Sequence, residues 1–194
     1  TLQKPPAVAL AVQSAMCRMA TPGRGGHPPA MRAADAGYDC RCLAGALFDA
    51  QPEQVVFTMN ATHALNLAIK TLVKPGGRAV ISGFEHNAVL RPLHHLGAEI
   101  IVAGRRLFDP ADTISAFDRA ITPGTSAVIC THVSNVFGYI LPVEEIAALC
   151  RARGVPFVLD ASQSAGLLPV RLAELGADFI GMPGHKALNG PQGT

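Results

Sequence analysis

Short apolar runs alternate with amphipathic stretches along most of this chain. The runs are rich in β-branched residues and bounded by Gly and Pro, which is typical of strands, and the stretches between them have helical spacing. The pattern predicts strands at 55–59, 78–83, 99–104, 126–133, 156–162 and 178–184, with helices at 61–73, 85–97, 112–121, 143–154 and 169–176. Alternating strands and helices form a mostly parallel sheet. The sequence therefore predicts a three-layer α/β/α fold in which helices cover both faces of the sheet.

The first fifty residues have a different pattern. They predict a helix at 5–19, a loop at 21–29 with the sequence TPGRGGHPP, and a longer helix at 30–49. We therefore expect two parts, an N-terminal helical segment with its loop at 1–50 and a larger ligand-binding domain at 51–194.

Composition narrows the class of protein. Hydrophobic residues make up 49% of the 194 residues and charged residues 15%, which favours a globular chain with a large core. The net charge of +2 gives no indication of a nucleic-acid partner. No uninterrupted apolar run approaches the roughly 18 residues of a membrane span, so no membrane association is expected.

The cysteines indicate a reducing compartment. Their number is odd, and they form neither a C-x-x-C pair nor a cluster with metal-ligand spacing, so we expect a cytoplasmic protein without a metal site. Cys40 and Cys42 could form a redox or metal pair, but two ordinary half-buried thiols on a helix are the favoured interpretation. The others are Cys17, Cys130 and Cys150.

Polar and titratable residues follow the predicted strands. Right-handed crossovers place the carboxyl ends of parallel strands at one edge of the sheet, where α/β folds bind ligands. Packing alone does not account for such a cluster, so we expect one common site. The groups are Asn60–His63, Glu85–Asn87, His132–Asn135, Asp160 with Gln163, and His185–Lys186.

Asp160 and Lys186 are the most informative pair. They lie 26 residues apart (186 − 160), about the length of one β-α-β unit of roughly 30 residues. A carboxylate and a lysine that converge on one small molecule meet the requirement of pyridoxal phosphate (PLP). The lysine forms a Schiff base and the acid keeps the pyridine nitrogen protonated, so that the ring withdraws electrons. We therefore predict PLP as the cofactor.

The other candidates each have a structural alternative. Asn60 and Thr62 open a helix whose first amides can bind a phosphate, or they simply cap it. His86 can stack on an aromatic cofactor and move protons, or it is an ordinary loop histidine. Asn135 can bind a cofactor oxygen or a substrate carboxylate, or it favours a turn for local reasons. Gln163 can donate to the phenolic oxygen of the cofactor.

One family shares these motifs. The chain resembles the class V aminotransferase group of fold-type I PLP enzymes and, within it, the cysteine desulfurase and selenocysteine lyase branch. The matching pieces, in the expected order, are GRGGH, FTMNATHALNLAI, EHNAVLRPL, THVSNVFG, VLDASQSAG and DFIGMPGHKALNGPQGT.

The resemblance implies a role for each candidate. Lys186 corresponds to the Schiff-base lysine and His86 to the ring-stacking residue, and these two are the predicted catalytic residues. Asp160 and Gln163 correspond to partners of the pyridine nitrogen and the phenolic oxygen. The remaining cofactor contacts implied are Thr62, His63 and His185 at the phosphate, and Asn135 at the cofactor or substrate.

The resemblance also implies a homodimer, a small amino-acid substrate such as L-cysteine, and a sulfur-acceptor protein. Its members are considerably longer, and they carry a small C-terminal domain with a substrate-binding arginine and a sulfur-attacking cysteine. They also place an antiparallel strand between the first and last strands found here, and without it two strand edges are expected to stay unpaired. Pro183 stands where members carry a phosphate-binding serine or threonine.

Other functions stay open at this point. Aminotransferase, lyase or epimerase chemistry would use the same cofactor site, and a non-catalytic fragment that needs a partner chain would use none of it. A dinucleotide-binding fold is disfavoured because no G-x-G-x-x-G follows the first predicted strand.

Overall fold

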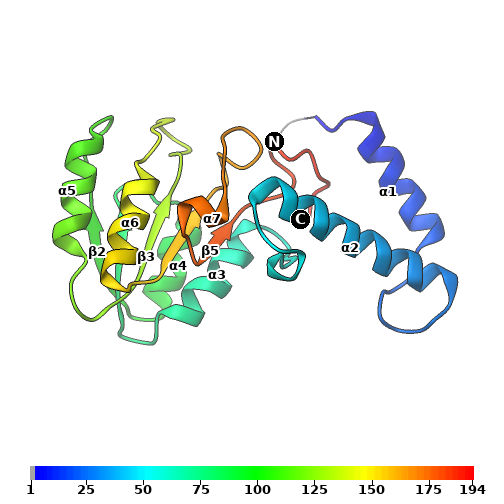
Figure 1. Ribbon diagram of the computed structural model, residues 1–194, viewed down its shortest axis with the longest axis horizontal. Helices are drawn as coiled ribbons and strands as arrows, with labels where there is room; N and C mark the ends of the chain where they lie inside the picture. Colours follow the sequence, from blue (N-terminus) through cyan, green and yellow to red (C-terminus); the bar gives the residue numbers. More distant parts are fainter. Residues whose placement is uncertain (1–2) are drawn as a thin grey trace.

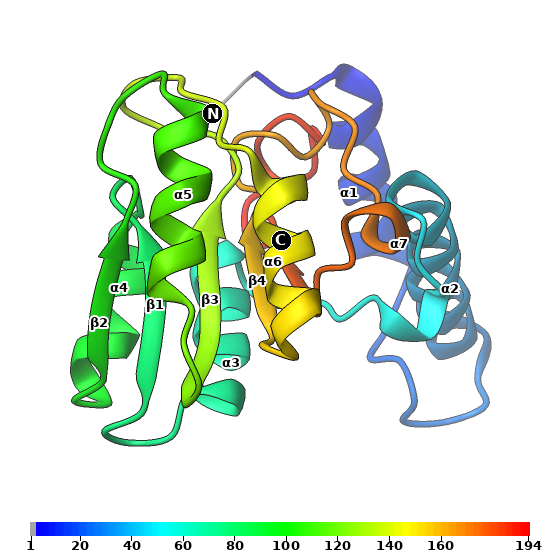
Figure 2. The ribbon, with the colours of Figure 1, turned by 60° about the vertical axis from the view of Figure 1, so that its left-hand side comes forward.

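A computed structural model describes residues 3–194. Its centre is a five-stranded sheet in the order β2-β1-β3-β4-β5, and every neighbouring pair is parallel. All arrowheads therefore point to the same edge (Figure 2). The strands are β1 (Arg78–Ser82), β2 (Glu99–Ala103), β3 (Thr125–Thr131), β4 (Phe157–Asp160) and β5 (Phe179–Gly181).

Helices cover both faces of the sheet, so the predicted three-layer α/β/α fold is confirmed. On one face α3 (Ala61–Leu72) and α4 (Asn87–His95) bury a core with the inward residues of β1 and β3. On the other, α5 (Pro110–Ala120) and α6 (Val143–Arg153) bury a second and larger core. Side chains of a strand alternate between these two cores, as a sheet covered on both faces requires.

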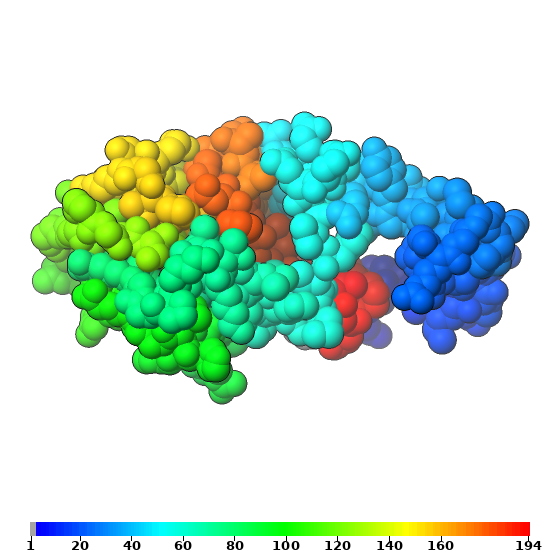
Figure 3. Space-filling view, turned by 90° about the horizontal axis from the view of Figure 1, so that it is seen from below, coloured from blue at the N-terminus to red at the C-terminus, as the bar shows by residue number. Residues whose placement is uncertain are grey.

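The N-terminal helices stand apart from the sheet. Helices α1 (Pro6–Arg18) and α2 (Pro28–Phe48) form an extension at one end of the molecule (Figure 1), separated by a visible opening from the last loop of the chain (Figure 3). No residue of helix α1 is buried. Helix α2 contacts the larger core, the one under α5 and α6, through Phe48 at its C-terminal end. The two helices and the loop between them match the elements predicted for residues 1–50.

The strand predicted at 55–59 is wrong. This segment is extended but pairs with no strand within the described residues, and β5 forms the edge of the sheet instead. A short 3-10 turn, Pro52–Gln54, precedes it. Val56 is 71% exposed and Met59 65% exposed. The apolar sequence has strand character, but a strand exists only where another backbone supplies its hydrogen bonds.

Other boundaries differ from the prediction as well. The helix predicted at 169–176 shrinks to α7 (Leu172–Leu175), because Pro169 lies outside it and Gly176 ends it in a left-handed conformation. The predicted strand 178–184 is paired only over β5, and 126–133 ends at Thr131. These strands end earlier than their apolar pattern indicates. Residues that follow the shortened strands belong to the candidate site.

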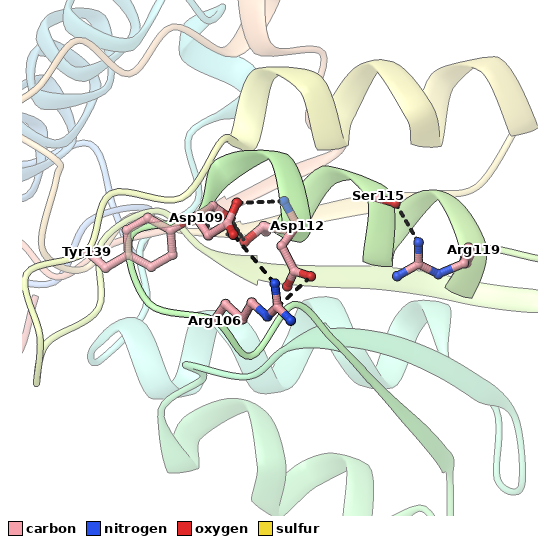
Figure 4. A network of polar contacts seen from close by, with 7 residues as sticks. Arg106, Asp109, Asp112, Ser115, Arg119 and Tyr139 are labelled. Carbon is pink, nitrogen blue, oxygen red and sulfur yellow. Dashed lines mark hydrogen bonds and ion pairs between the residues drawn. The ribbon is translucent and has the colours of Figure 1, made fainter.

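Polar contacts fix the N-terminus of α5 near the same edge of the sheet (Figure 4). The Asp109 carboxylate caps the helix by accepting the Asp112 amide at 2.9 Å, and Arg106 lies 3.8 Å from Asp112. The buried hydroxyls of Thr113 and Tyr139 form a hydrogen bond of 3.2 Å, which ties α5 to the loop after β3. The exposed ion pair adds little to stability, so the buried contact and the cap position this helix.

We expect Phe117→Ala to lower the free energy of unfolding by about 3–5 kcal/mol. Phe117 lies on α5, is fully buried, and belongs to the larger core, so its removal leaves a cavity. Urea unfolding followed by circular dichroism measures the change. Leu10→Ala is the control, because Leu10 is 65% exposed on α1 and should cost less than about 0.5 kcal/mol.

Candidate active site

A cavity of about 270 Å³ opens at the carboxyl edge of the sheet, around the ends of β3, β4 and β5. Its walls come from segments far apart in the sequence, as the parallel topology predicts. Its lining includes Asn60, Ala61, Thr62, Leu65, His86, Ala88, Thr131, Val133, Asn135, Asp160, Ser162, Gln163, Pro183, His185 and Lys186. Every residue to which the resemblance gives a role lines this cavity except His63, whereas Glu85, Asn87, His132 and Ser134, which the sequence grouped with them, do not.

Asp160 is the last residue of β4, at the floor of the cavity. Its register partners are Thr131 on β3 and Gly181 on β5, so it lies between two strand ends, and it is 3% exposed. Its Oδ1 accepts the Ser162 amide at 2.9 Å. This bond fixes the rotamer of the carboxylate and leaves Oδ2 available for a ligand.

Lys186 lies in the loop that follows β5, half-buried, and lines the same cavity. Because the β4–β5 pairing is parallel and direct, Asp160 and Lys186 both line this cavity, and their joint role toward a ligand stays a prediction. Among the ion pairs of residues 3–194, none joins the two groups. Both groups therefore line the cavity without being paired with each other.

The loop that carries Lys186 is closed by its own backbone. The Gly184 amide donates to the carbonyl of Thr194 at 3.0 Å, and the Gly190 amide donates to the carbonyl of Gly184 at 2.8 Å. A Cβ on Gly184 would lie 2.5 Å from the Thr194 hydroxyl oxygen. The small residue at 184 therefore makes room for Thr194.

The first turn of α3 forms one wall. Asn60 caps the helix, its Oδ1 accepting the His63 amide at 2.9 Å, so the amides of Ala61 and Thr62 remain for a ligand. Thr62 lines the cavity, but His63 does not. The His63 ring instead turns back toward its own loop, where Nδ1 accepts the Met59 amide at 3.5 Å. A contact between His63 and phosphate stays a prediction.

His86 caps α4 and faces the cavity. Its Nδ1 accepts the Ala88 amide at 3.1 Å. A nitrogen that accepts a hydrogen bond carries no proton, so the neutral ring has its proton on Nε2. The cap thus orients the imidazole and selects its tautomer.

Two more predicted residues come from the loops after β3 and β4. Asn135 follows β3 and is exposed, and Gln163 follows β4 and is half-buried; both line the cavity. Ser134, beside Asn135, is buried and its hydroxyl accepts the Phe137 amide at 3.3 Å. This local turn holds Asn135 at the cavity, so the turn and the binding role predicted for this segment are compatible.

The sequence analysis missed two contributors. Thr131 lines the cavity at the end of β3. Glu85, although quoted beside His86, received no role, and its carboxyl group proves to be buried between two strand ends. An acidic residue in the short turn after a mostly apolar strand was the signal that could have identified it.

The buried thiols are unreactive. Burial raises the pKa of Cys150 to about 12 and that of Cys130 well above its usual value, so both stay protonated. Cys17 and Cys40 are exposed, and Cys42 is half-buried. In residues 3–194 no group of three His, Cys, Asp or Glu side chains is arranged to hold a metal ion. None of the helices in that range is long and apolar enough to cross a membrane.

The chain belongs to the class V aminotransferase family. The family described as "Aminotransferase class-V" matches residues 1–194. The predicted family resemblance is thereby confirmed.

Relatives with curated names point to one branch of this family. The chain is 37% identical over 154 residues to "Cysteine desulfurase IscS" of Pectobacterium carotovorum subsp. carotovorum (strain PC1), covering 76% of this chain and 38% of that protein. It is 31% identical over 182 residues to a "Probable cysteine desulfurase" of Methanothermobacter thermautotrophicus, covering 90% and 44%. The chain spans less than half the length of these relatives.

The fold agrees with a solved structure of the same branch. The apo structure of a cysteine desulfurase from Thermococcus onnurineus NA1 superposes with a TM-score of 0.89 at 30% identity, covering all of this chain and 50% of that one. The parallel sheet and its helical layers are therefore those of this enzyme group.

The donor set fits the cofactor that the sequence predicts. The cavity offers a buried carboxylate for a pyridine nitrogen, an amine for an aldehyde carbon, and free amides at a helix start for a phosphate. The histidine that caps α4 supplies a flat ring on one side. The chemistry of PLP matches these groups one by one.

Proposed function

We propose that this chain forms the PLP-binding part of a cysteine desulfurase. The observation that carries the proposal is the single cavity into which neighbouring parallel strands bring Asp160 and Lys186. The similarity to cysteine desulfurases, in sequence and in fold, supports the same function.

Each residue then has a chemical task. When bound, PLP supplies an electron-withdrawing ring that weakens a bond at the Cα of an amino acid. The Asp160 carboxylate, fixed by the Ser162 amide, would accept a hydrogen bond from the ring nitrogen and keep it protonated. Lys186 would hold the cofactor covalently and, as a free amine, would take the substrate Cα proton and return it. The His86 ring would lie against the cofactor and exclude water from that side.

The remaining contacts hold the cofactor. The amides of Ala61 and Thr62, together with the Thr62 hydroxyl, bind the phosphate at the start of α3. Gln163 donates to the phenolic oxygen, and Asn135 binds the cofactor or the substrate carboxylate. His185, which lines the cavity, is a further phosphate contact, and the family resemblance assigns the same role to His63.

L-cysteine is the proposed substrate. A protein named SspA, 26% identical and with a TM-score of 0.90 over all of this chain and 57% of its own, is described in complex with cysteine. Attack on the substrate sulfur requires a reactive thiol, and the buried Cys130 and Cys150 are unsuited to it. We propose that a cysteine and an arginine outside these residues complete the reaction, and that a sulfur-acceptor protein takes the product.

We also propose a cytoplasmic homodimer. Exposed apolar side chains gather on the N-terminal extension and the segment after it, which is typical of surfaces covered by another chain. They include Leu10, Met16, Leu43, Leu47, Val56, Phe57 and Met59. The free thiols are compatible with a reducing compartment.

Exchange of the substrate Cα proton tests the proposal. The PLP-loaded chain is incubated with L-cysteine in deuterated buffer, and exchange at Cα is followed by proton NMR. We expect exchange, because this step needs only the ring, Asp160 and Lys186. Formation of alanine and sulfide with added dithiol would support desulfuration, whereas formation of a 2-oxo acid would indicate an aminotransferase. No exchange by a chain that binds PLP would indicate a non-catalytic fragment.

We expect Pro183→Ser to tighten PLP binding roughly tenfold, the value of one added hydrogen bond to a charged group. Pro183 is buried and lines the cavity without a hydroxyl or an amide proton, so it offers the phosphate no donor. Fluorescence titration with PLP measures the dissociation constant. Pro183→Ala is the matched control. If alanine tightens binding as much as serine does, the gain comes from backbone freedom and the explanation fails.

A further inference from the structure

A buried carboxyl group lies between two strand ends, just outside the cavity. Glu85 follows β1, and its Oε1 accepts two hydrogen bonds, from the Ser82 hydroxyl at 2.5 Å and from the Thr131 amide at 2.7 Å. Its Oε2 is buried and has no hydrogen-bond partner among the described residues. A side chain buried with an unpartnered oxygen is costly, so its position calls for a function.

The Glu85 side chain continues the hydrogen bonding along β3 beyond the point where the β1 backbone ends its pairing with β3. The register of β1 with β3 ends at the pair Ile81–Ile129, two residues before Thr131. The Glu85 carboxyl accepts the Thr131 amide at this point and so replaces the missing strand. Thr131 is in turn the register partner of Asp160. The turn after β1 is thus connected through β3 to the residue at the floor of the cavity.

The side chain does not itself reach the cavity. Side chains alternate along a strand, so Ser82 shares a face with Val80 and belongs with the core under α5 and α6. Asp160 shares a face with Val158, which belongs to the core under α3. Glu85 binds Ser82 and is absent from the cavity lining, whereas the next residue, His86, is part of it. Glu85 can act on a ligand only through its neighbours.

We propose that Glu85 is a positioning residue of the active site, which fixes the His86 ring over the cavity by clamping the turn after β1 to the end of β3. The proposal rests on the proposed function for the identity of the ligand. The clamp itself is a property of the chain without cofactor.

Glu85 holds this place as a neutral acid. Burial raises its pKa to about 8, against the hydrogen bonds from Ser82 and Thr131, which lower it. The nearby charge of Asp160 on β4 raises it further, and Cys130 on β3, which faces the same group, stays protonated. At pH 7 the clamp therefore adds no second negative charge beside Asp160.

The pH dependence of the free energy of unfolding should reveal whether the Glu85 carboxyl is protonated in the folded chain. The folded-state pKa lies above the usual 4.5, so the folded chain keeps a proton that the unfolded chain loses. The contribution of Glu85 to stability is therefore fully present below about pH 4.5 and declines as the pH rises to about 8. Glu85→Gln cannot ionise, so relative to this variant the urea midpoint of the wild type should fall across that window. A constant difference would overturn the assignment of a neutral acid.

NMR of the cofactor-free chain tests the clamp. Glu85→Ala removes the carboxyl, and Glu85→Asp draws it back by one methylene, so both should shift the imidazole signals of His86 and the amide signal of Ala88. Glu85→Gln retains an acceptor oxygen and should restore both toward the wild type. Unchanged His86 and Ala88 signals in Glu85→Ala, or equal shifts in all three variants, would overturn the proposal. If alanine prevents folding, the aspartate and glutamine variants decide the question.

PLP affinity and the visible absorbance of the PLP-bound chain give a second test. Glu85→Ala should weaken PLP binding roughly tenfold, as the loss of an outer partner of a binding residue commonly does, and should shift the visible absorbance of the bound cofactor. A chain that loses stability but keeps its PLP affinity and absorbance would show a merely structural role and overturn the proposal. If the wild type itself binds no PLP, the proposed function fails, and the NMR of the cofactor-free chain still decides the clamp.

Discussion

Lys186→Ala is expected to abolish covalent attachment of PLP. After incubation with PLP and reduction with borohydride, the wild type should carry the label on the peptide that contains Lys186, and the variant should carry none. The physical reason is position: this amine lines the cavity beside Asp160 without being held in an ion pair with it. An amine that lines the same cavity as a bound aldehyde can form a Schiff base with it. Peptide mapping by mass spectrometry measures the label.

The same variant should lose proton exchange at the substrate Cα by about 10³-fold or more, because the group that carries the proton is gone. Lys70→Ala is the matched control. Lys70 is exposed on α3 and lines an adjoining groove of about 540 Å³ between α3 and α4, whose lining does not include Asp160, so its loss should leave the label on Lys186. A label scattered over Lys4, Lys70 and Lys74 in the wild type would mean that no cofactor site forms.

Asp160→Asn is expected to slow Cα exchange by roughly 10²–10³-fold, the scale of losing one preorganised electrostatic contact. Asparagine is nearly isosteric and its Oδ1 can still accept the Ser162 amide, so the site should keep its shape. What is lost is the negative charge that keeps the ring nitrogen protonated. The exchange rate in deuterated buffer and the visible absorbance of bound PLP measure the effect.

Asp178→Asn supplies the control for this prediction. Asp178 lies at the opposite end of the same strand pair, where its Oδ2 accepts the Phe157 amide at 2.8 Å. Its substitution should lower stability and leave Cα exchange close to the wild-type rate. If both variants slow exchange equally, the effect of Asp160→Asn is one of general stability, and the assigned role is wrong.

The three inner strands could be predicted because their apolar runs are buried on both faces, and the edge strand β2 (Glu99–Ala103) was predicted as well. β1, β3 and β4 lie inside the sheet and contain the sequences AVIS, AVICT and FVLD. Such mostly apolar runs are typical of strands with a core on each face. The segment 55–59 has the same composition and is no strand. The composition of a segment shows that it favours an extended backbone. Whether the segment forms a strand depends on the neighbouring backbone that supplies its hydrogen bonds.

The site divides in a similar way. Residues directly after a strand could be placed from sequence, because a parallel topology fixes which edge they reach; Asp160, His86 and Asn135 are of this kind. His63 could not be placed, since its direction depends on how the Asn60 cap turns the first residues of α3. The sequence could not show which residue fills the space beside Gly184, because Thr194, ten residues later in the chain, folds back against it.

The sequence by itself determined the class of fold, the edge that carries the site, and the Asp160–Lys186 pair, because periodicity and strand order are local properties that topology rules convert into space. Only the tertiary structure decided which apolar segments pair, which way each ring points, and that Glu85 is a buried neutral clamp. Those features depend on desolvation and on hydrogen bonds between residues as far apart as Glu85 and Thr131. Such contacts come into existence when the chain folds, and no local pattern encodes them.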